Sequence, residues 1–207
     1  GKIDVTKAEE NTMQSIRGKE VAMIFQEPMT CLNPVLSLKT QLTEPLIQHQ
    51  SMTMDEAEAK ILSLLKRVRI PDPEKKLEQY PHHLSGGMRQ RAMIAMALSC
   101  KPSLLIADEP TTALDVTIQA QILDLIKDLQ DEFGMTVMFI THDMAVIAEM
   151  ADRVVVMFKG KIVEQGSVDQ IFHSPEHAYT KKLINAVPRM GSMTGKSSPE
   201  KFPLIEA

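Results

Sequence analysis

The chain has 207 residues, with 23 Lys and Arg against 27 Asp and Glu for a formal net charge of -4. This length suits one domain, or one domain with a subdomain, that can bury a core. Hydrophobic residues make up 43% of the chain, an ordinary globular composition that excludes collagen-like, disulfide-rich and wholly disordered proteins. The lack of a basic excess disfavours nucleic-acid binding through a bulk basic surface and leaves open only a local basic stripe.

No apolar run is long enough to predict a transmembrane helix. The N-terminus lacks both an initiator Met and the apolar centre of a signal peptide, so we expect a chain that does not begin where its gene does. Cys31 and Cys100 lie far apart with no CxxC spacing, which indicates neither a disulfide framework nor a cysteine metal site. A reduced cytosolic setting follows as the default.

Apolar runs and helical periodicities alternate along the chain. The predicted strands cover 21–25, 103–107, 136–140, 153–158 and 162–166. The predicted helices lie within 42–68 and over 73–79, 88–99, 116–132 and 144–150. This order predicts βαβ units and an α/β fold with a mostly parallel sheet, and the apolar run at 104–107 predicts a strand covered on both faces. The tail from about Met190 loses periodicity, which predicts disorder.

The strand at 103–107 ends in two adjacent carboxylates, Asp108 and Glu109. An Asp held at a strand end can bind Mg²⁺, and the neighbouring Glu can polarise an attacking water. An acidic turn after a strand has the same sequence, so this pattern alone leaves both interpretations open.

Ser85, Gly86 and Gly87 precede the helix predicted at 88–99. Two glycines at a helix start let the backbone approach a ligand, and the free N–H groups and the helix dipole favour an anion. A plain helix cap is the competing interpretation.

His142 follows the strand at 136–140, between Thr141 and Asp143. A lone His of this kind is more often a neighbour of a helix cap than a functional group, but its place after a strand favours function here. His173 and His177 have the i, i+4 spacing of metal ligands, yet Pro175 between them argues against a regular helix and no third ligand is evident.

Together, five motifs in this order resemble the nucleotide-binding domain of ATP-binding cassette (ABC) proteins. They are a Q-loop (Ile24-Phe25-Gln26-Glu27-Pro28), a signature motif (Leu84-Ser85-Gly86-Gly87-Met88), a Walker B strand (Leu104–Glu109), a D-loop (Pro110–Asp115) and a switch histidine (Ile140–Asp143). The chain looks more specifically like the ATPase subunits of dipeptide and oligopeptide (peptide/nickel) importers. The residues that carry this resemblance are Met88, Thr112 and the segments 25–34, 174–180 and 186–188.

The resemblance implies a P-loop NTPase-like ABC fold with a mostly parallel sheet and a helical subdomain. Residues 1–28 would be the remainder of the N-terminal core up to the Q-loop, and 29–99 the helical subdomain with the signature motif. Residues 100–170 would form the RecA-like core with Walker B, D-loop and switch His, and 171–207 a C-terminal extension.

It also implies roles around ATP and Mg²⁺. Glu109 would be the catalytic general base, and His142 would contact the γ-phosphate. Asp108 would hold Mg²⁺, while Gln26 would sense both the metal and the γ-phosphate.

Ser85, Gly86 and Gly87 would bind the γ-phosphate of an ATP held by the opposite subunit, and Asp115 would bridge the two halves. The implied partners are a second ABC ATPase subunit in a homo- or heterodimer, two transmembrane permease subunits and an extracytoplasmic substrate-binding protein, with no nucleic acid. The protein would work from the cytoplasmic face of the cell membrane, and the sequence does not identify its substrate. A soluble, non-transport ABC ATPase and a non-catalytic remnant remain the alternatives.

One family motif is missing. The phosphate-binding Walker A loop, G-x-x-x-x-G-K-[ST], should lie several tens of residues before Gln26, but only 25 residues precede it and none matches. The run Gly191–Ser197 has one residue too few between its glycines and follows no strand. The chain is therefore interpreted as a fragment, and in isolation it is expected to bind ATP poorly and to hydrolyse it negligibly. The extension has no cysteines, so no iron–sulfur cluster is expected.

Overall fold

The computed structural model describes residues 3–27, 31–112 and 114–186. The chain divides into two compact units, Gly1–His142 and Asp143–Ala207, which are taken separately below. Within the described residues, no helix is both long and apolar enough to cross a membrane. The tail predicted to be disordered from Met190, and the run at 191–197, lie outside these residues.

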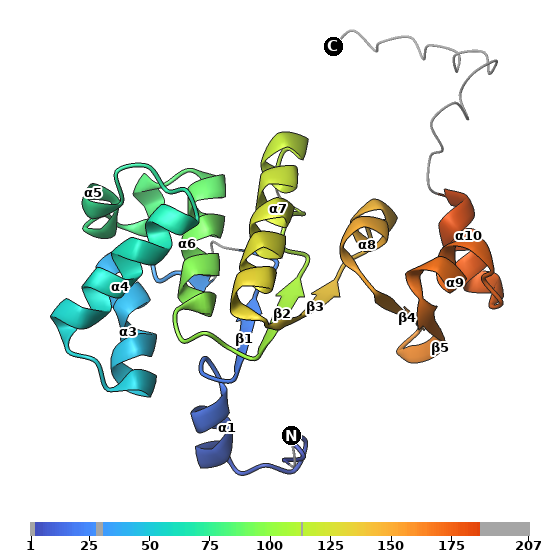
Figure 1. Ribbon diagram of the computed structural model, residues 1–207, viewed down its shortest axis with the longest axis horizontal. Coiled ribbons are helices and arrows are strands. Elements are labelled where there is room, and N and C mark those ends of the chain that lie inside the picture. Colours follow the sequence, from blue (N-terminus) through green and yellow to red (C-terminus); the bar gives the residue numbers. More distant parts are fainter. Residues whose placement is uncertain (1–2, 28–30, 113, 187–207) are drawn as a thin grey trace, which may run out of the picture. The chain divides into compact units, whose positions relative to one another are not determined.

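The first unit is built from helices and three strands (Figure 1). Its helices are α1 (Glu10–Ile16), α3 (Leu38–Gln50), α4 (Met54–Arg67), α5 (Pro73–Leu77), α6 (Gly86–Leu98) and α7 (Val116–Phe133), with a 3-10 turn at Pro81–His83. Its strands are β1 (Val21–Ile24), β2 (Leu104–Asp108) and β3 (Thr136–Ile140). The three strands form a parallel sheet in the order β1-β2-β3, which agrees with the predicted α/β class.

The register of this sheet aligns the carboxyl ends of its strands. Ile24 pairs with Ala107, and Asp108 pairs with Ile140. The loops that follow β1, β2 and β3 therefore leave the sheet at the same edge, where open α/β sheets place their ligands.

The expectation that β2 is covered on both faces is wrong. Leu105 and Ala107 are fully buried, whereas Leu104 and Ile106 on the other face are only half-buried. On that second face of the sheet, Ile140 of β3 is 45% exposed. Side chains of α6 and α7 pack into the same core as Leu105, and the described residues supply no comparable cover for the other face.

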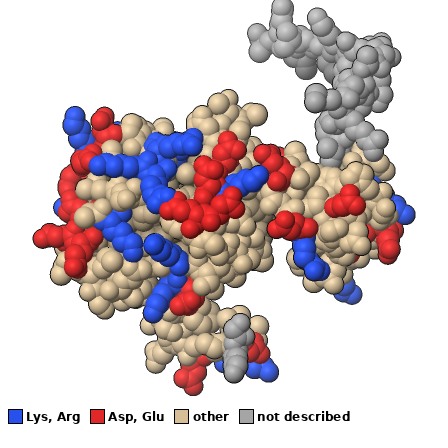
Figure 2. All heavy atoms as spheres, in the orientation of Figure 1, with Lys and Arg blue, Asp and Glu red and all other residues tan. Residues whose placement is uncertain are grey.

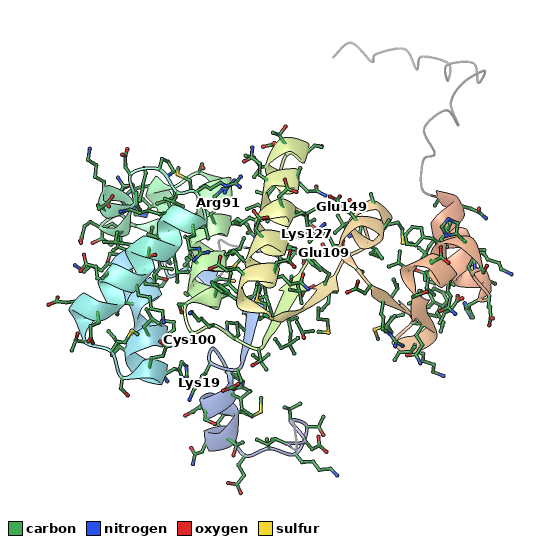
Figure 3. The ribbon with its side chains drawn as sticks, in the orientation of Figure 1. Lys19, Arg91, Cys100, Glu109, Lys127 and Glu149 are labelled. Atoms are coloured by element: carbon green, nitrogen blue, oxygen red, sulfur yellow. The ribbon has the colours of Figure 1, made fainter. Side chains whose placement is uncertain are left out.

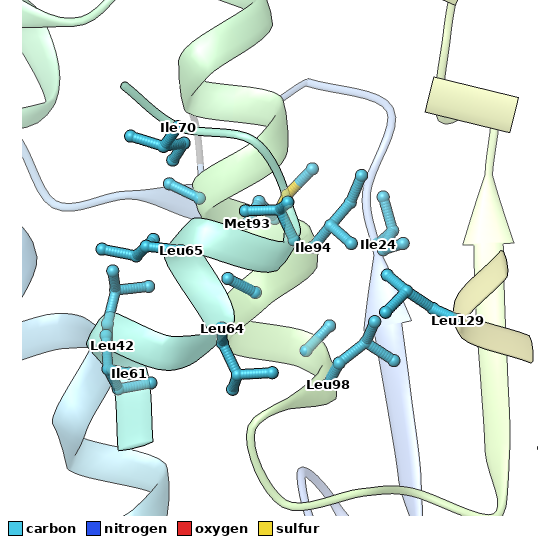
Figure 4. Close-up of a cluster of buried hydrophobic side chains, with 14 of the residues drawn as sticks. Ile24, Leu42, Ile61, Leu64, Leu65, Ile70, Met93, Ile94, Leu98 and Leu129 are labelled. Carbon is cyan, nitrogen blue, oxygen red and sulfur yellow. The ribbon is translucent and has the colours of Figure 1, made fainter. Parts of the chain in front are cut away.

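A helical region lies against the buried face of the sheet. The predicted stretch at 42–68 is two helices, because Ser51 leaves the helical conformation with a φ of 52° and Thr53 starts α4 with a reciprocal capping box to Glu56. Leucines, isoleucines and a methionine from α3, α4, α6 and α7 join Ile24 of β1 in one core (Figure 4). This core fixes α6, the helix that follows the Ser-Gly-Gly motif, against the sheet.

Arg91 of α6 ties three helices together (Figure 3). The side chain is 7% exposed, and its guanidinium donates to the carbonyl oxygen of Val68 at 2.8 Å and to Oε1 of Gln121 at 2.9 Å. A second contact between α4 and α7 is the ion pair of Arg67 with Glu132. Acidic and basic side chains lie side by side on the face shown in Figure 2. Polar contacts thus join α4, α6 and α7 beside the apolar core.

The substitution Arg91→Leu should lower the free energy of unfolding by about 2 kcal/mol, because it leaves the buried carbonyl of Val68 and the half-buried amide of Gln121 without their donor. Urea unfolding followed by circular dichroism measures the change. Lys127→Leu, on the exposed side of α7, is the matched control and should change the free energy by less than about 0.5 kcal/mol. Equal effects of the two substitutions would contradict the role assigned to Arg91.

The described part of the second unit, residues 143–186, consists of a hairpin and three helices. Its elements are α8 (Met144–Met150), β4 (Arg153–Phe158), β5 (Lys161–Ser167), α9 (Val168–His173) and α10 (Ala178–Ala186). The antiparallel strands β4 and β5 are joined at Lys159 and Gly160, whose φ angles of 50° and 75° suit a tight hairpin turn. A separate small core centres on Val154, Val156 and Ile171.

Glu164 of β5 holds the start of α10. Its carboxylate accepts hydrogen bonds from the backbone N–H of Glu176 at 2.7 Å and of His177 at 3.1 Å. The backbone N–H of Glu176 is the main cause that lowers the pKa of Glu164 from its ordinary 4.5. The imidazole Nδ1 of His177 lies 3.1 Å from the N–H of Tyr179, and that of His173 lies 3.0 Å from Asp169, so both histidines make contacts within the protein.

Because the folded pKa of Glu164 is lowered, its contribution to stability is complete above pH 4.5 and is lost as the pH falls through the folded pKa. Glu164→Gln should therefore weaken the second unit at pH 7 and reduce its loss of stability in acid. Hydrogen exchange of the α10 amides, followed from pH 7 down to pH 3, measures the local stability of the second unit in both chains. Glu149→Gln, an exposed carboxylate on α8, should leave that profile as it is.

Candidate active site

Three loops at the carboxyl edge of the first sheet bring together three of the predicted site residues. Glu109, labelled in Figure 3, follows β2 and contacts the other two residues. Gln26, after β1, donates from Nε2 to Oε2 of Glu109 at 2.7 Å, and Nδ1 of His142, after β3, lies 2.9 Å from Oε1. Thr112 donates its hydroxyl to Oε2 at 2.9 Å. Both carboxylate oxygens of Glu109 are thus engaged.

The backbone of Glu109 is in an unusual conformation. Its φ is 43°, in the left-handed region that costs a residue with a Cβ about 1 kcal/mol or more. The N–H of Glu109 donates to the carbonyl oxygen of Ile140 at 2.8 Å, and the N–H of Thr112 donates to the carbonyl oxygen of Glu109 at 3.3 Å. These bonds offset the strain and direct the carboxylate across the ends of the strands.

The surroundings keep Glu109 ionised. The hydrogen bond with His142 is the largest cause that lowers the pKa of Glu109 from 4.5, followed by the one from Thr112. The side chain of Glu109 is 22% exposed, whereas that of His142 is 74% exposed. A carboxylate that is ionised at neutral pH and reachable from solvent can accept a proton from a water molecule.

Asp108 is the last residue of β2 and half-buried. Among the residues that the structure describes, its carboxylate has no hydrogen-bond or ion-pair partner, so both oxygens can serve a ligand. The same part of the chain has no cluster of three His, Cys, Asp or Glu side chains that could hold a metal ion. This donor set fits Mg²⁺, which proteins commonly bind through one or two carboxylates together with phosphate oxygens of the substrate.

The Ser-Gly-Gly motif lies at the start of α6. The helix begins at Gly86, two residues before the predicted start, because Ser85 caps it by accepting a hydrogen bond from the N–H of Met88 at 3.3 Å. A Cβ on Gly87 would lie 3.2 Å from Cγ2 of Ile118 in α7, so a larger residue would crowd this contact. Asp115 caps α7 in the same way, accepting from the N–H of Ile118 at 3.0 Å.

The predicted site residues therefore form two groups. Gln26, Glu109 and His142 make one, with Asp108 adjacent in the chain. The second comprises Ser85, Gly86, Gly87 and Asp115 at the starts of α6 and α7. Within the described residues, no hydrogen bond joins the side chains of the two groups.

Sequence reasoning missed two contacts to the Glu109 turn. From the sequence, Thr112 indicates only a resemblance to importer ATPase subunits, although its place three residues after Glu109 in a turn is a signal that its hydroxyl can reach the carboxylate. Gln90, in the second turn of α6, donates to the carbonyl oxygen of Pro110. The sequence held no signal for that pairing.

Comparison with known families agrees with this geometry. Residues 1–112, just over half of the chain, match the family described as ABC transporter. Residues 163–204 match the family described as oligopeptide/dipeptide transporter, C-terminal region. The chain belongs to the ABC transporter family. Within that family it belongs to the ATP-binding proteins of the oligopeptide/dipeptide subfamily.

Individual relatives are similar over nearly the whole chain. The glutathione import ATP-binding protein GsiA of Salmonella typhimurium is 58% identical over 205 residues, which are 99% of this chain and 33% of the relative. GsiA of Escherichia coli K12 is 57% identical over 203 residues, again 33% of its length. The chain thus spans about a third of the length of the curated relatives it matches.

Solved structures show the same fold. A dimeric post-hydrolysis state of the ATP-binding cassette MJ0796, bound to ADP and Pi, matches with a TM-score of 0.70 at 29% identity, over 80% of this chain and 70% of that one. The structure of cbiO1 from Clostridium perfringens, part of an ABC transporter complex, matches with a TM-score of 0.67 at 28% identity, over 87% of this chain and 68% of that one. The ABC ATPase fold class predicted from the sequence is confirmed, and the roles of the individual residues stay predictions.

Replacing His142 by Ala should raise the pKa of Glu109 toward 4.5, because it removes the largest cause of the lowered value. Thr112→Val should raise it by a smaller amount. Carbon-detected NMR titration of the Glu109 carboxyl measures both changes. His82→Ala, in the exposed 3-10 turn, is the control, and a Glu109 titration that does not respond to His142→Ala would refute the contact.

Proposed function

We propose that this chain is part of an ATP-binding and ATP-hydrolysing subunit that energises import of di- or oligopeptides across the cytoplasmic membrane. The observation that carries the proposal is the Glu109 carboxylate, held ionised between Gln26, Thr112 and His142 and adjacent in the chain to the carboxylate of Asp108. Membership of the ABC transporter family supports it. Cleavage of the γ-phosphate needs an aligned water and charge neutralisation more than covalent help from the protein.

In this mechanism Glu109 is the general base. As the oxygen of a water molecule bonds to the γ-phosphorus, the bond to the leaving β-phosphate oxygen breaks and the water proton passes to a carboxylate oxygen of Glu109. Thr112 and Gln26 hold Oε2, which fixes the orientation of the carboxylate. His142 is largely exposed, and it would exchange its contact with Glu109 for one with the γ-phosphate when ATP is bound. Asp108 and Gln26 would hold Mg²⁺, which neutralises phosphate charge when bound.

The second group of site residues supports a two-subunit arrangement. Ser85, Gly86 and Gly87 present a capped helix start and no hydrogen bond to the Glu109 group, which suits contact with the nucleotide of an opposite subunit. One of the matched structures is of a dimeric cassette. We therefore propose a homo- or heterodimer in which Asp115 lies between the halves.

Exposed apolar side chains offer a surface for the membrane subunits. Val35 is 76% exposed, and Phe25, Leu36 and Tyr80 are each about 40% exposed or more. The N–H of Leu38 donates to the carbonyl oxygen of Gln79 at 2.8 Å, which links the segment that holds Val35 and Leu36 to the one that holds Tyr80. Large exposed apolar side chains of this kind mark interaction surfaces. The proposed partners are two permease subunits, supplied by an extracytoplasmic binding protein, with this chain at the cytoplasmic face of the membrane.

Glu109→Gln in the gene that encodes this chain is expected to abolish uptake of a labelled dipeptide, because the amide cannot accept the proton from water. Glu149→Gln, an exposed carboxylate on α8, is the control and should preserve uptake. Labelled glutathione in parallel assays distinguishes the two substrate classes. Unchanged uptake in the Glu109→Gln strain would contradict the proposed role of Glu109. Co-purification with hydrophobic subunits rather than with ribosomes or DNA separates an importer from a soluble ABC ATPase.

The purified 207-residue chain should bind MgATP weakly and hydrolyse it negligibly, because its sequence has no Walker A loop to hold the β-phosphate. Isothermal titration calorimetry and release of inorganic phosphate measure the two properties. Robust turnover that Glu109→Gln abolishes would refute this prediction, since the catalytic geometry would then suffice without that loop.

A further inference from the structure

One buried polar side chain connects the two groups of site residues. Gln90 is 1% exposed and lies in the second turn of α6, the helix that Ser85 caps. Its Nε2 donates to the carbonyl oxygen of Pro110 at 2.6 Å. Pro110 directly follows Glu109, so the signature helix is bonded to the turn that carries the proposed general base.

This bond has more effect on geometry than a surface contact would. A buried amide donor has no water to replace its partner, so breaking the bond leaves both the amide and the carbonyl unsatisfied. The side-chain amide of Gln90 and the carbonyl of Pro110 are therefore strongly constrained to stay together. A displacement of α6 at this level is passed to the backbone at Pro110.

The turn at Glu109 and Pro110 responds to a displacement of α6 because its backbone conformation is not one that the chain prefers by itself. Glu109 holds a φ of 43°, which persists only where the surroundings impose it. One restraint is the bond from the Glu109 N–H to Ile140, at the end of β3. Gln90 provides a second restraint, one residue further on, at the carbonyl oxygen of Pro110.

We propose that Gln90 is a positioning residue that sets the orientation of the Glu109 carboxylate through the carbonyl of Pro110. By this route the start of α6, which would meet the nucleotide of the opposite subunit, is coupled to the general base of its own chain. The catalytic meaning of the coupling rests on the proposed function. The positioning itself can be measured without nucleotide.

The test compares two glutamine substitutions in the 207-residue chain. Gln90→Met keeps the length of the side chain and removes the donor. Gln41→Met is the matched control, because Gln41 is also buried and donates to the carbonyl oxygens of Asn33 and Leu36, away from the Glu109 turn. Hydrogen exchange of the Glu109 amide, which is bonded to Ile140, reports on the turn.

The expected result is Glu109 amide exchange about tenfold faster in Gln90→Met than in the unsubstituted chain, with no such change in Gln41→Met. Equal changes in both variants, or an unchanged Glu109 amide in folded Gln90→Met, would overturn the proposal. If Gln90→Met does not fold, Gln90→Asn serves the same test, because it keeps a buried amide but shortens it by one methylene.

The two proposals can fail separately. Faster exchange in Gln90→Met, combined with normal peptide uptake in cells that carry Glu109→Gln, would refute the proposed function and leave the positioning by Gln90 standing. Unchanged exchange in Gln90→Met, combined with lost uptake in cells that carry Glu109→Gln, would overturn the positioning and leave the function.

Discussion

The geometry of the candidate site depends on the parallel pairing of β1, β2 and β3 in a register that makes their carboxyl ends coincide. The pair of Asp108 and Ile140 is the last step of that register, and the next backbone bond, from the Glu109 N–H to the Ile140 carbonyl, extends it into the loop. Gln26 and His142 reach the same carboxylate only because their strands end at the same level. A slip of one residue in any strand would reverse its side chains between the two faces and separate the group.

Buried polar contacts specify which atoms of the helices and loops meet, which the apolar core does not. Leucine and isoleucine packing between α3, α4 and α6 holds the helices close without specifying which atoms meet. Arg91 and Gln90, adjacent in α6, make directional bonds to Val68 on one side and Pro110 on the other. The position of α6 is thereby tied both to the helical region and to the turn that carries Glu109.

The two units have separate cores, and each contributes a different line of evidence on the family. The first carries the loop residues of the candidate site and the match to the ABC transporter family. The second carries the match to the oligopeptide/dipeptide C-terminal region, and there Glu164 fixes the start of α10 on β5. The class of importer is thus indicated mainly outside the unit that carries the candidate catalytic residues.

The sequence alone determined the order of elements and the fold class, because apolar runs and helix stops are local properties of the chain. Motifs that resemble a known family also implied that Gln26, Glu109 and His142 act around one nucleotide. Only the tertiary structure decided that Thr112 and Gln90 contact the Glu109 turn, and that one face of β2 is incompletely covered. The physical reason is that burial and side-chain contacts depend on which elements pack together: Gln26 and Glu109 are 83 residues apart, and no local pattern encodes a 2.7 Å hydrogen bond across that separation.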